Sequence, residues 1–495
     1  MITFLGGLAI LIVGGYFYGK YCEKVFGPDE RETPAITKAD GVDFVVMKKW
    51  KNSLIELLNI AGTGPILGAI QGVLFGPIAF LTIPIGCVLV GSMHDYFSGM
   101  ISMRNGGAQM PKLIRKYLGN RVIKVYNFAL WFLMILVGVV FVYTPGDLIV
   151  TQVLGQQASL DNTVVWVVYG GIFAYYLVAT LFPIDAIIGR IYPIFGGFLV
   201  VSALGIFIGI MMDGGENLTN LSFASNPFTM HPGGLPFIPV FFITVACGIM
   251  SGFHATQATL ISRTVKNEKE GKGTFFNMML IEGFIAMCWA AGAMILFGRG
   301  IDITTAPISV VGLVSKEFLG TVGGMIAILG VIVLPITSGD TAFRSLRLMV
   351  AEQFNIDQKI PKNRIITTAC LFVPAIVILY YAKTSPEGFS VLWRYFAFTN
   401  QFIGTFALAT IAVYLYTQGK NYLIALIPGM FYFFVTLSFI FHAPLGLKLD
   451  ERLGLEPASY MASMILALLF VAGYFWFIKK HARSEKEQIL NNSFS

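Results

Sequence analysis

Charged residues are scarce in this chain of 495 residues, where Asp, Glu, Lys and Arg together make up 12%. A typical soluble domain carries about 25% charged residues, because water must wet its surface. Apolar side chains make up 56% of this sequence, and its mean hydropathy is +0.74. These proportions exclude an ordinary soluble domain and a disordered chain. They predict an all-α protein that crosses a membrane many times.

Cysteine is also rare, and the five cysteines form no Cys-x-x-Cys pair. The sequence therefore gives no support to a disulfide scaffold or a zinc site. It contains no Gly-x-x-x-x-Gly-Lys-Ser/Thr loop for ATP phosphates. It also contains neither a Gly-x-Ser-x-Gly elbow nor a His-Glu-x-x-His string. We expect a protein that is not an enzyme and that holds no cofactor, apart from Na⁺ as one candidate coupling ion.

Windows of about 20 apolar residues predict about thirteen membrane-spanning helices. The segments between them are too short to form a soluble domain. The expected spans are 2–19, 52–74, 76–99, 124–144, 164–183, 190–212, 236–261, 275–297, 320–343, 365–383, 391–416, 422–442 and 459–478.

Basic residues are distributed unevenly between the two sets of alternate loops. One set, which includes the C-terminal tail, holds 28 of the 34 Lys and Arg residues. Because Lys and Arg collect on the cytoplasmic side, we expect the N-terminus outside and the C-terminus inside. A nucleic-acid partner would need these charges on one shared surface with interleaved aromatic residues, and we expect no such partner.

Two of the expected spans contain residues that interrupt helices. The second span carries Gly-Thr-Gly-Pro at 62–65, where proline removes a backbone donor and glycine weakens the helix. Since proline favours the start of a helix, we expect a half-helix to begin at Pro65. The seventh span carries a second candidate break at 248–252. Close packing of small residues between helices is the alternative explanation for both segments.

The two interrupted spans are five apart in the chain. If the first span is an addition, spans two to six and seven to eleven form two inverted five-helix repeats. Matched breaks in such repeats indicate a solute site at the membrane midplane, as in leucine-transporter-like folds. We expect an extra helix with a cytoplasmic linker over 1–50, repeats over 51–212 and 236–416, and two C-terminal helices with a cytoplasmic tail over 417–495.

The two breaks provide the predicted solute contacts. Unwound backbone is costly in hydrocarbon unless it lines a cavity or binds something. The start of a half-helix also offers N–H groups and a positive dipole end to an anion. The residues expected to contact solute are Ala61, Gly62, Thr63, Gly64, Pro65, Gln71, Gly248, Ser251, Gly252, His254 and Gln257.

The end of the ninth span is the predicted ion site. Hydroxyls of Thr337, Ser338 and Thr341 with the carboxylate of Asp340 offer hard oxygens suited to Na⁺, with Thr337 and Ser338 as candidate ligands. Asp340 could carry a proton instead, or it could form an ion pair with Arg344 one helical turn further on.

Other ionisable residues lie within the expected spans and are candidates for function because charge is costly there. Glu282 in the eighth span is a candidate for proton coupling, with a structural hydrogen bond as the alternative. Glu56, His94 and Asp95 lie nearer the cytoplasmic edge, where we expect interface anchoring or loop capping.

Four motifs in order resemble the carbon starvation protein (CstA-type) family of membrane transporters. The resemblance implies secondary uptake in the cytoplasmic membrane of bacteria, within the amino acid–polyamine–organocation superfamily. It further implies peptide utilisation or proton-driven pyruvate import. The motifs are Ala61-Gly62-Thr63-Gly64-Pro65 with Gly68-Ala69-Ile70-Gln71-Gly72, His94-Asp95-Tyr96, Ser251-Gly252-Phe253-His254, and 337–345 from Thr337 to Ser345.

We therefore expect a secondary active transporter in the bacterial inner membrane that imports a small organic nutrient, a peptide or pyruvate, by alternating access. Its partners would be that solute, H⁺ or Na⁺, and the lipid bilayer. A channel or nutrient sensor of the same fold is the first alternative. An intramembrane hydrolase is the second, in which Ser251 and His254, three residues apart, form a nucleophile–base pair.

Overall fold

The computed structural model describes residues 1–40, 44–179, 184–223, 225–304, 307–358, 360–385, 387–456 and 459–493. Every regular element in these ranges is a helix. Ten helices are long and apolar enough to cross a membrane, two further pairs of helices are bent at a break, and Thr163–Ala179 is a shorter apolar helix. These segments overlap the thirteen expected spans one by one. The expected end of one span at 183 lies outside the described residues.

The first half of the chain supplies the extra N-terminal helix, the first bent pair and four further spanning segments. Short π-helical turns interrupt several of these helices, at 10–14, 87–91 and 149–153. The α-helices are α1 (Ile2–Ala9), α2 (Gly15–Phe26), α3 (Pro34–Thr37), α4 (Lys49–Ile60), α5 (Thr63–Gly72), α6 (Ala79–Gly86), α7 (Ser92–Arg104), α8 (Met110–Leu118), α9 (Asn120–Leu148), α10 (Thr163–Ala179) and α11 (Ile184–Asp213).

The second half supplies the second bent pair and six spans after it. Of the ten long spans, those of α14 and α17 are the most buried, and that of α20 is the least buried. The α-helices are α12 (Phe242–Thr244), α13 (Gly252–Ile261), α14 (Asn277–Gly298), α15 (Pro307–Gln353), α16 (Pro361–Thr384), α17 (Gly388–Thr417), α18 (Leu423–His442), α19 (Leu449–Arg452) and α20 (Met461–Ser493).

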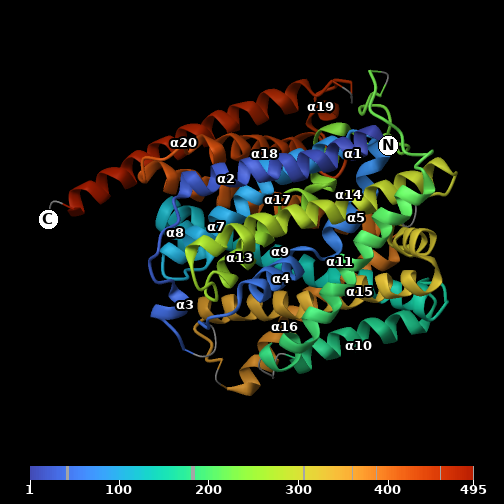
Figure 1. Ribbon diagram of the computed structural model, residues 1–495, viewed down its shortest axis with the longest axis horizontal. Coiled ribbons are helices and arrows are strands. Elements are labelled where there is room, and N and C mark those ends of the chain that lie inside the picture. The colour runs from blue at the N-terminus through green and yellow to red at the C-terminus, as the bar shows by residue number, and fades with distance from the viewer. Residues whose placement is uncertain are drawn as a thin grey trace.

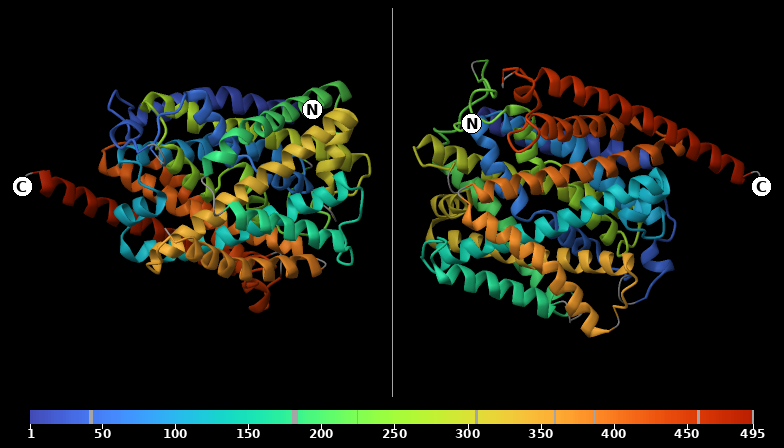
Figure 2. Two further views of the ribbon diagram at one scale, coloured as in Figure 1. Left: turned by 90° about the horizontal axis from the view of Figure 1, so that it is seen from below. Right: turned by 180° about the vertical axis from the view of Figure 1, so that it is seen from behind.

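The long helices run roughly side by side, and the two chain ends lie at opposite ends of the bundle (Figure 1). Two further views agree, with α20 projecting beyond the other helices toward the C-terminus (Figure 2). An odd number of membrane crossings places the two chain ends on opposite sides of the membrane. The basic helix α8 lies at the same end as the C-terminus, which is the end expected to face the cytoplasm.

Two helix boundaries differ from the expected ones. The half-helix α5 begins at Thr63, two residues before Pro65. Proline is tolerated throughout a first turn because the N–H groups there have no partner within the helix. α15 begins at Pro307 and not at 320, and it bends at Gly320, whose φ of 68° is a left-handed conformation that favours glycine. Residues 307–319 therefore form a separate helical segment before the expected span.

The orientation of the bundle can be tested by cysteine labelling. Ser159 lies in the exposed segment before α10, and Gln418 lies in the exposed turn after α17. In a Cys370→Ala background, which removes the one exposed cysteine among the described residues, we expect Ser159→Cys to react with an impermeant maleimide on intact cells. Gln418→Cys should react only after the membrane is opened. The reverse pattern would place the N-terminus in the cytoplasm.

Candidate functional site

The first break lies between α4 and α5, which meet at an angle of 49°. Ala61 and Gly62 leave the helical conformation, with ψ values of 54° and −145°. The helix ends here because Gly-Thr-Gly-Pro discards helix propensity and one backbone donor. The first expected interruption is therefore present in the structure.

The second break lies between residues 244 and 252, and its two helical arms meet at 55°. Ala246–Gly248 form one 3₁₀ turn, and Ser251 is extended with φ −131° and ψ 133°. α13 begins at Gly252. The chain therefore unwinds a few residues earlier than expected, and the unwound segment covers the predicted 248–252.

The two broken helices cross at their breaks. A Cβ atom built on Gly64 would lie 2.6 Å from Cys247 Cβ, and one on Gly68 would lie 2.7 Å from the Thr244 carbonyl oxygen. Gly248 faces Pro65, whose Cα atom would lie 3.7 Å from an added Cβ. Small residues at the first break therefore serve close packing as well as unwinding, which combines the two explanations that the sequence left open.

A small cavity of about 20 Å³ lies between the breaks. Such a volume holds about one water molecule, so an organic solute needs helix movement to enter. Four predicted solute contacts line it, namely Gly62, Gly64, Ser251 and His254. The other lining residues are Asn59, Ile60, Val137, Phe141, Cys247, Phe253, Phe396 and Asn400.

Asn400 of α17 connects the second break to the neighbouring helix. Its side-chain oxygen accepts hydrogen bonds from the Ser251 hydroxyl, at 2.8 Å, and from the Phe253 backbone N–H, at 3.3 Å. The amide therefore satisfies a peptide group that unwinding releases. Because the Ser251 hydroxyl donates to Asn400, it is not paired with His254 as a hydrolase would require.

Five buried ionisable side chains from four helices meet beside the cavity, and we call them the acid–histidine cluster: Glu56, His94, Asp95, His254 and Glu282. His94 Nδ1 lies 2.7 Å from one carboxylate oxygen of Asp95. His254 Nδ1 lies 3.3 Å from the other oxygen of Asp95, and His254 Nε2 lies 3.8 Å from Glu282 Oε1. His254 thus lines the cavity and contacts two carboxylates.

Burial determines how the charge and the hydrogen bonds of the acid–histidine cluster are balanced. Each of its side chains is almost completely inaccessible, and seven of their polar atoms have no protein hydrogen-bond partner in the described ranges. Three carboxylates buried together require protons or cations to balance part of their charge.

The expectation that Glu56, His94 and Asp95 anchor an interface is wrong, since all three lie inside the bundle. Their positions near one edge of a span did not reveal this, because neighbouring helices bury α7 from Ser92 to Met103 and bury Glu56 of α4.

The predicted ion site on α15 has a different arrangement. The Thr337 hydroxyl donates to the Leu334 carbonyl at 2.8 Å, and the Thr341 hydroxyl donates to the Ser338 carbonyl at 2.8 Å. Asp340 lies 3.5 Å from Arg344, the pairing that the sequence offered as an alternative. Among these residues, the Ser338 hydroxyl is buried and has no hydrogen-bond partner within the described chain. The Na⁺ site at Thr337 and Ser338 stays a prediction.

The other predicted contacts lie at or near the breaks. Ala61, Thr63, Pro65 and Gly252 belong to the unwound segments or to the first turns after them. Gln71 is two turns from the first break, where its amide donates to the Leu67 carbonyl.

Gln257 is buried one turn after His254, and its amide donates to the Thr256 hydroxyl. Asn400 was not among the predicted contacts, although Thr399, Asn400 and Gln401 form a polar run within an apolar span.

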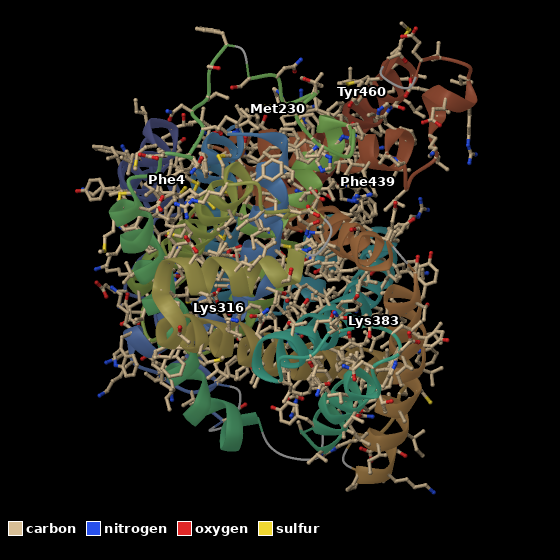
Figure 3. All side chains as sticks on the ribbon, turned by 90° about the vertical axis from the view of Figure 1, so that its right-hand side faces the viewer. Phe4, Met230, Lys316, Lys383, Phe439 and Tyr460 are labelled. Atoms are coloured by element: carbon tan, nitrogen blue, oxygen red, sulfur yellow. The ribbon has the colours of Figure 1, made fainter. Side chains whose placement is uncertain are left out.

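The loop that carries Met230 and His231 covers the far end of α5. The His231 ring packs on Phe75 with centroids 4.6 Å apart, and Met230 contacts the position of Gly76. Met230 lies on the face shown in Figure 3, which is opposite to the C-terminus. Burial, with a smaller contribution from Arg394, lowers the pKa of His231 to about 4. The ring is therefore neutral at pH 7, as this apolar contact requires.

A model of the family described as "Carbon starvation protein CstA" matches residues 1–189, 139–317 and 308–439. The chain belongs to this family. The matched residues include both breaks and the whole acid–histidine cluster. Membership confirms the resemblance read from the sequence motifs.

Three curated relatives place the chain within the family. It is 42% identical over 333 residues to an uncharacterized membrane protein of Haemophilus influenzae, covering 58% of this chain and 89% of that protein. It is 24% identical to the pyruvate/proton symporter BtsT of Escherichia coli, over 61% of this chain and half of that protein. It is 22% identical to the peptide transporter CstA of Bacillus subtilis, over 98% of both chains.

The fold is similar to that of a solved transporter. The manganese transporter of Eremococcus coleocola, crystallised with an aromatic bis-isothiourea compound, aligns with a TM-score of 0.52 at 12% identity. The alignment covers 91% of this chain and 99% of that one. Together with the named relatives, this identifies a multi-pass membrane protein of a transporter family.

The cavity between the breaks can be tested by filling it. A Cβ on Gly64, which lines the cavity, would lie 2.6 Å from Cys247 Cβ in the second break. We expect Gly64→Ala to reduce solute uptake roughly tenfold to hundredfold, because overpacking a tight site costs about 1–3 kcal/mol. Uptake would be measured at matched protein levels in the membrane.

Gly171→Ala on α10 is the matched control, because its Cβ would meet nothing within 4 Å. Normal uptake by a well-inserted Gly64→Ala protein would show that solute passes elsewhere.

Proposed function

We propose that this protein is a proton-coupled importer of a small carboxylate-bearing nutrient, of the pyruvate or short-peptide class. The observation that carries the proposal is the position of His254. Its imidazole lines the cavity between the breaks and lies within 4 Å of both Asp95 and Glu282. A proton taken up by the acid–histidine cluster therefore changes the charge next to bound solute.

The two half-helix starts support an anionic solute group. α5 and α13 each have ten residues, and each begins at a break beside the cavity. Their N-terminal turns present the positive end of the helix dipole and N–H groups. A carboxylate placed between them gains favourable interactions although no Lys or Arg is among the described residues that line the cavity. Pyruvate and peptides share this group, and relatives named for each solute support the class.

Proton coupling follows from the way charge is balanced in the cluster. Entry of a carboxylate beside three buried acidic groups is unfavourable while those groups are ionised. Protonation of the His254–Asp95–Glu282 group removes that repulsion, and solute release favours loss of the proton. Solute and proton therefore move together. A Na⁺ ion at Thr337 and Ser338 is the alternative coupling device and predicts a sodium requirement.

The solute and the coupling ion can be tested in proteoliposomes. Vesicles loaded with unlabelled pyruvate or an unlabelled dipeptide should accumulate the corresponding labelled solute by counterflow. We expect one of the two to exchange at full rate in buffer without Na⁺. A strict need for Na⁺ would favour the α15 site, and no exchange of either solute would contradict the proposed function. Flux that does not saturate with concentration would indicate a channel.

If the acid–histidine cluster couples proton and solute movement, Glu282→Gln should lose accumulation driven by a pH gradient and keep solute exchange. For one proton per pyruvate anion, a pH gradient of one unit supports about tenfold accumulation, equivalent to about 1.4 kcal/mol. We expect Glu282→Gln to lose this accumulation while counterflow exchange persists.

Asp340→Asn is the comparison variant, since Asp340 pairs with Arg344 within α15, a helix that carries no member of the acid–histidine cluster. If Asp340→Asn abolished the proton-driven gradient and Glu282→Gln kept it, the coupling site would lie on α15.

A further inference from the structure

A cavity of about 400 Å³ lies at the end of the bundle opposite to α8 and the C-terminus. Two segments far apart in the chain form it, namely the loop 228–236 and the segment 442–460 between α18 and α20. We call it the loop cavity. Figure 3 shows Met230 of the first segment and Tyr460 of the second on the same face of the bundle. By the distribution of Lys and Arg, this end is the one expected to face the outside.

A buried carboxylate fixes a histidine in the wall of the loop cavity. Asp450 is 1% exposed, and its carboxylate accepts hydrogen bonds from the Ser463 hydroxyl and, at 2.8 Å, from the Ala462 backbone N–H. His442 Nδ1 lies 3.0 Å from the same carboxylate. Because an ionised carboxylate only accepts hydrogen bonds, Nδ1 carries a proton, and Nε2 of the neutral ring is an acceptor.

The second ring nitrogen of His442 is left for a ligand. The side chain is 7% exposed and lines the loop cavity, and Nε2 has no hydrogen-bond partner within the part of the chain that the structure describes. This atom is not among the fully buried unpaired atoms, unlike Nε2 of His94. The Tyr460 ring stacks on the imidazole with centroids 3.9 Å apart. The cavity wall therefore holds an accessible acceptor in a fixed orientation.

The groups around this acceptor favour a primary ammonium. Glu451 adds a carboxylate to the wall, and Phe228 and Tyr460 add aromatic rings. An ammonium donates to carboxylates and imidazole nitrogens, and it is attracted to aromatic faces. Lys448 lines the same cavity and offers a partner for a carboxylate. Its Nζ lies 3.8 Å from Glu451, and both side chains are nearly half exposed, so this ion pair is weak enough to open for a ligand.

The loop cavity suits a solute larger than pyruvate. Sites for small molecules have volumes of about 300–1,000 Å³, and this cavity lies within that range. Pyruvate has a carboxylate and no amino group, so it would leave the acceptors of Glu451 and His442 without a partner. An amino acid or a short peptide carries an ammonium, a carboxylate and an apolar part, which match the three kinds of group in the wall.

The loop that lines the cavity also contacts both broken helices. Phe228 and Pro236 line the cavity. Met230 and His231, between them in the chain, pack at the far end of α5. Pro236 directly precedes the helical arm Phe237–Thr244, which leads to the second break. A ligand in the cavity therefore touches the segment that covers one broken helix and begins the other.

We propose that the loop cavity binds an amino acid or a short peptide through its free amino group, before the solute reaches the central cavity. Glu451 pairs with the ammonium, His442 Nε2 accepts one of its hydrogens, and Lys448 pairs with the carboxylate. The role in uptake rests on the proposed function, and it narrows the carboxylate-bearing solute to one that also has an amino group. Binding to the cavity itself depends only on these side chains.

Protection of an introduced cysteine measures occupancy of the loop cavity. Thr229 is exposed and lines it. Full-length Thr229→Cys protein in a Cys370→Ala background would be labelled with a maleimide in nanodiscs, with alanyl-leucine, leucine or pyruvate added. We expect alanyl-leucine or leucine to slow labelling saturably, and the one that acts at lower concentration identifies the solute. Ser159→Cys, which is exposed outside the cavity, is the control and should label at an unchanged rate.

The amino group provides the chemical test. N-acetyl-alanyl-leucine, which lacks the ammonium, should protect Thr229→Cys less well than alanyl-leucine. Equal protection by the acetylated dipeptide or by pyruvate would overturn the assignment, and so would no protection by alanyl-leucine and leucine.

Charge removal tests the role of Glu451. Glu451→Gln should raise the concentration for half-protection at least about twofold, because an exposed charge pair contributes modestly to binding. The matched control is Glu456→Gln, which removes the same charge from an exposed position outside the cavity. An equal change in the two variants would contradict the pairing of Glu451 with the ligand.

Two measurements separate the loop cavity from the central cavity. Protection of Thr229→Cys should persist in Gly64→Ala, and its loss there would place the ligand at the breaks and overturn the loop-cavity site. Counterflow exchange of alanyl-leucine without protection would also overturn this site and leave the transport function standing. Protection without exchange of the protecting ligand or of pyruvate would support the site and contradict the proposed function.

Discussion

Unpaired backbone groups cannot remain in a lipid-like interior, and this constraint organises the centre of the protein. The chain unwinds at 61–62 and between 244 and 252, so peptide groups there need partners. Glycines let the two breaks approach until their backbones are in contact, and Asn400 accepts hydrogen bonds from the second break. The broken segments therefore stabilise each other, and under the proposed function a solute that enters between them replaces some of these contacts.

The acid–histidine cluster depends on the same geometry. α4 ends at the first break, four residues after Glu56, and α13 begins at the second break, two residues before His254. α4 and α13 thus each place an ionisable residue beside the helices that carry His94, Asp95 and Glu282. Under the proposed function, charge, solute and helix movement are coupled because α4 and α13 also hold members of the cluster. A shift of α13 changes the contacts of His254 with Asp95 and Glu282, and so changes where a proton is most stable.

The sequence predicted the spans, the two breaks and several cavity residues because those features are local. Glycine, proline and 20-residue apolar runs act on the segment that contains them. Asn400 and Phe141 were not predicted, since their place at the cavity depends on how α17 and α9 pack against distant helices. Glu56, His94 and Asp95 were misplaced for a related reason: position along a span gives depth in the membrane, but it does not give burial within the bundle. The cavity of about 800 Å³ beside α8 also arises from tertiary packing, since its walls come from segments between residues 38 and 353.

The small size of the central cavity determines what the proposed alternating access requires. That cavity holds about one water molecule, while a cavity of about 800 Å³ opens beside α8. At the opposite end of the bundle, His231 packs on Phe75, and Met230 contacts the position of Gly76 just after α5. Helix α9 lines both cavities, the central one at residues 137 and 141 and the larger one at residues 127 and 131. Under the proposed function, a solute can therefore enter the centre only when the two broken helices separate, and His254 changes its contacts with Asp95 and Glu282 in the same movement.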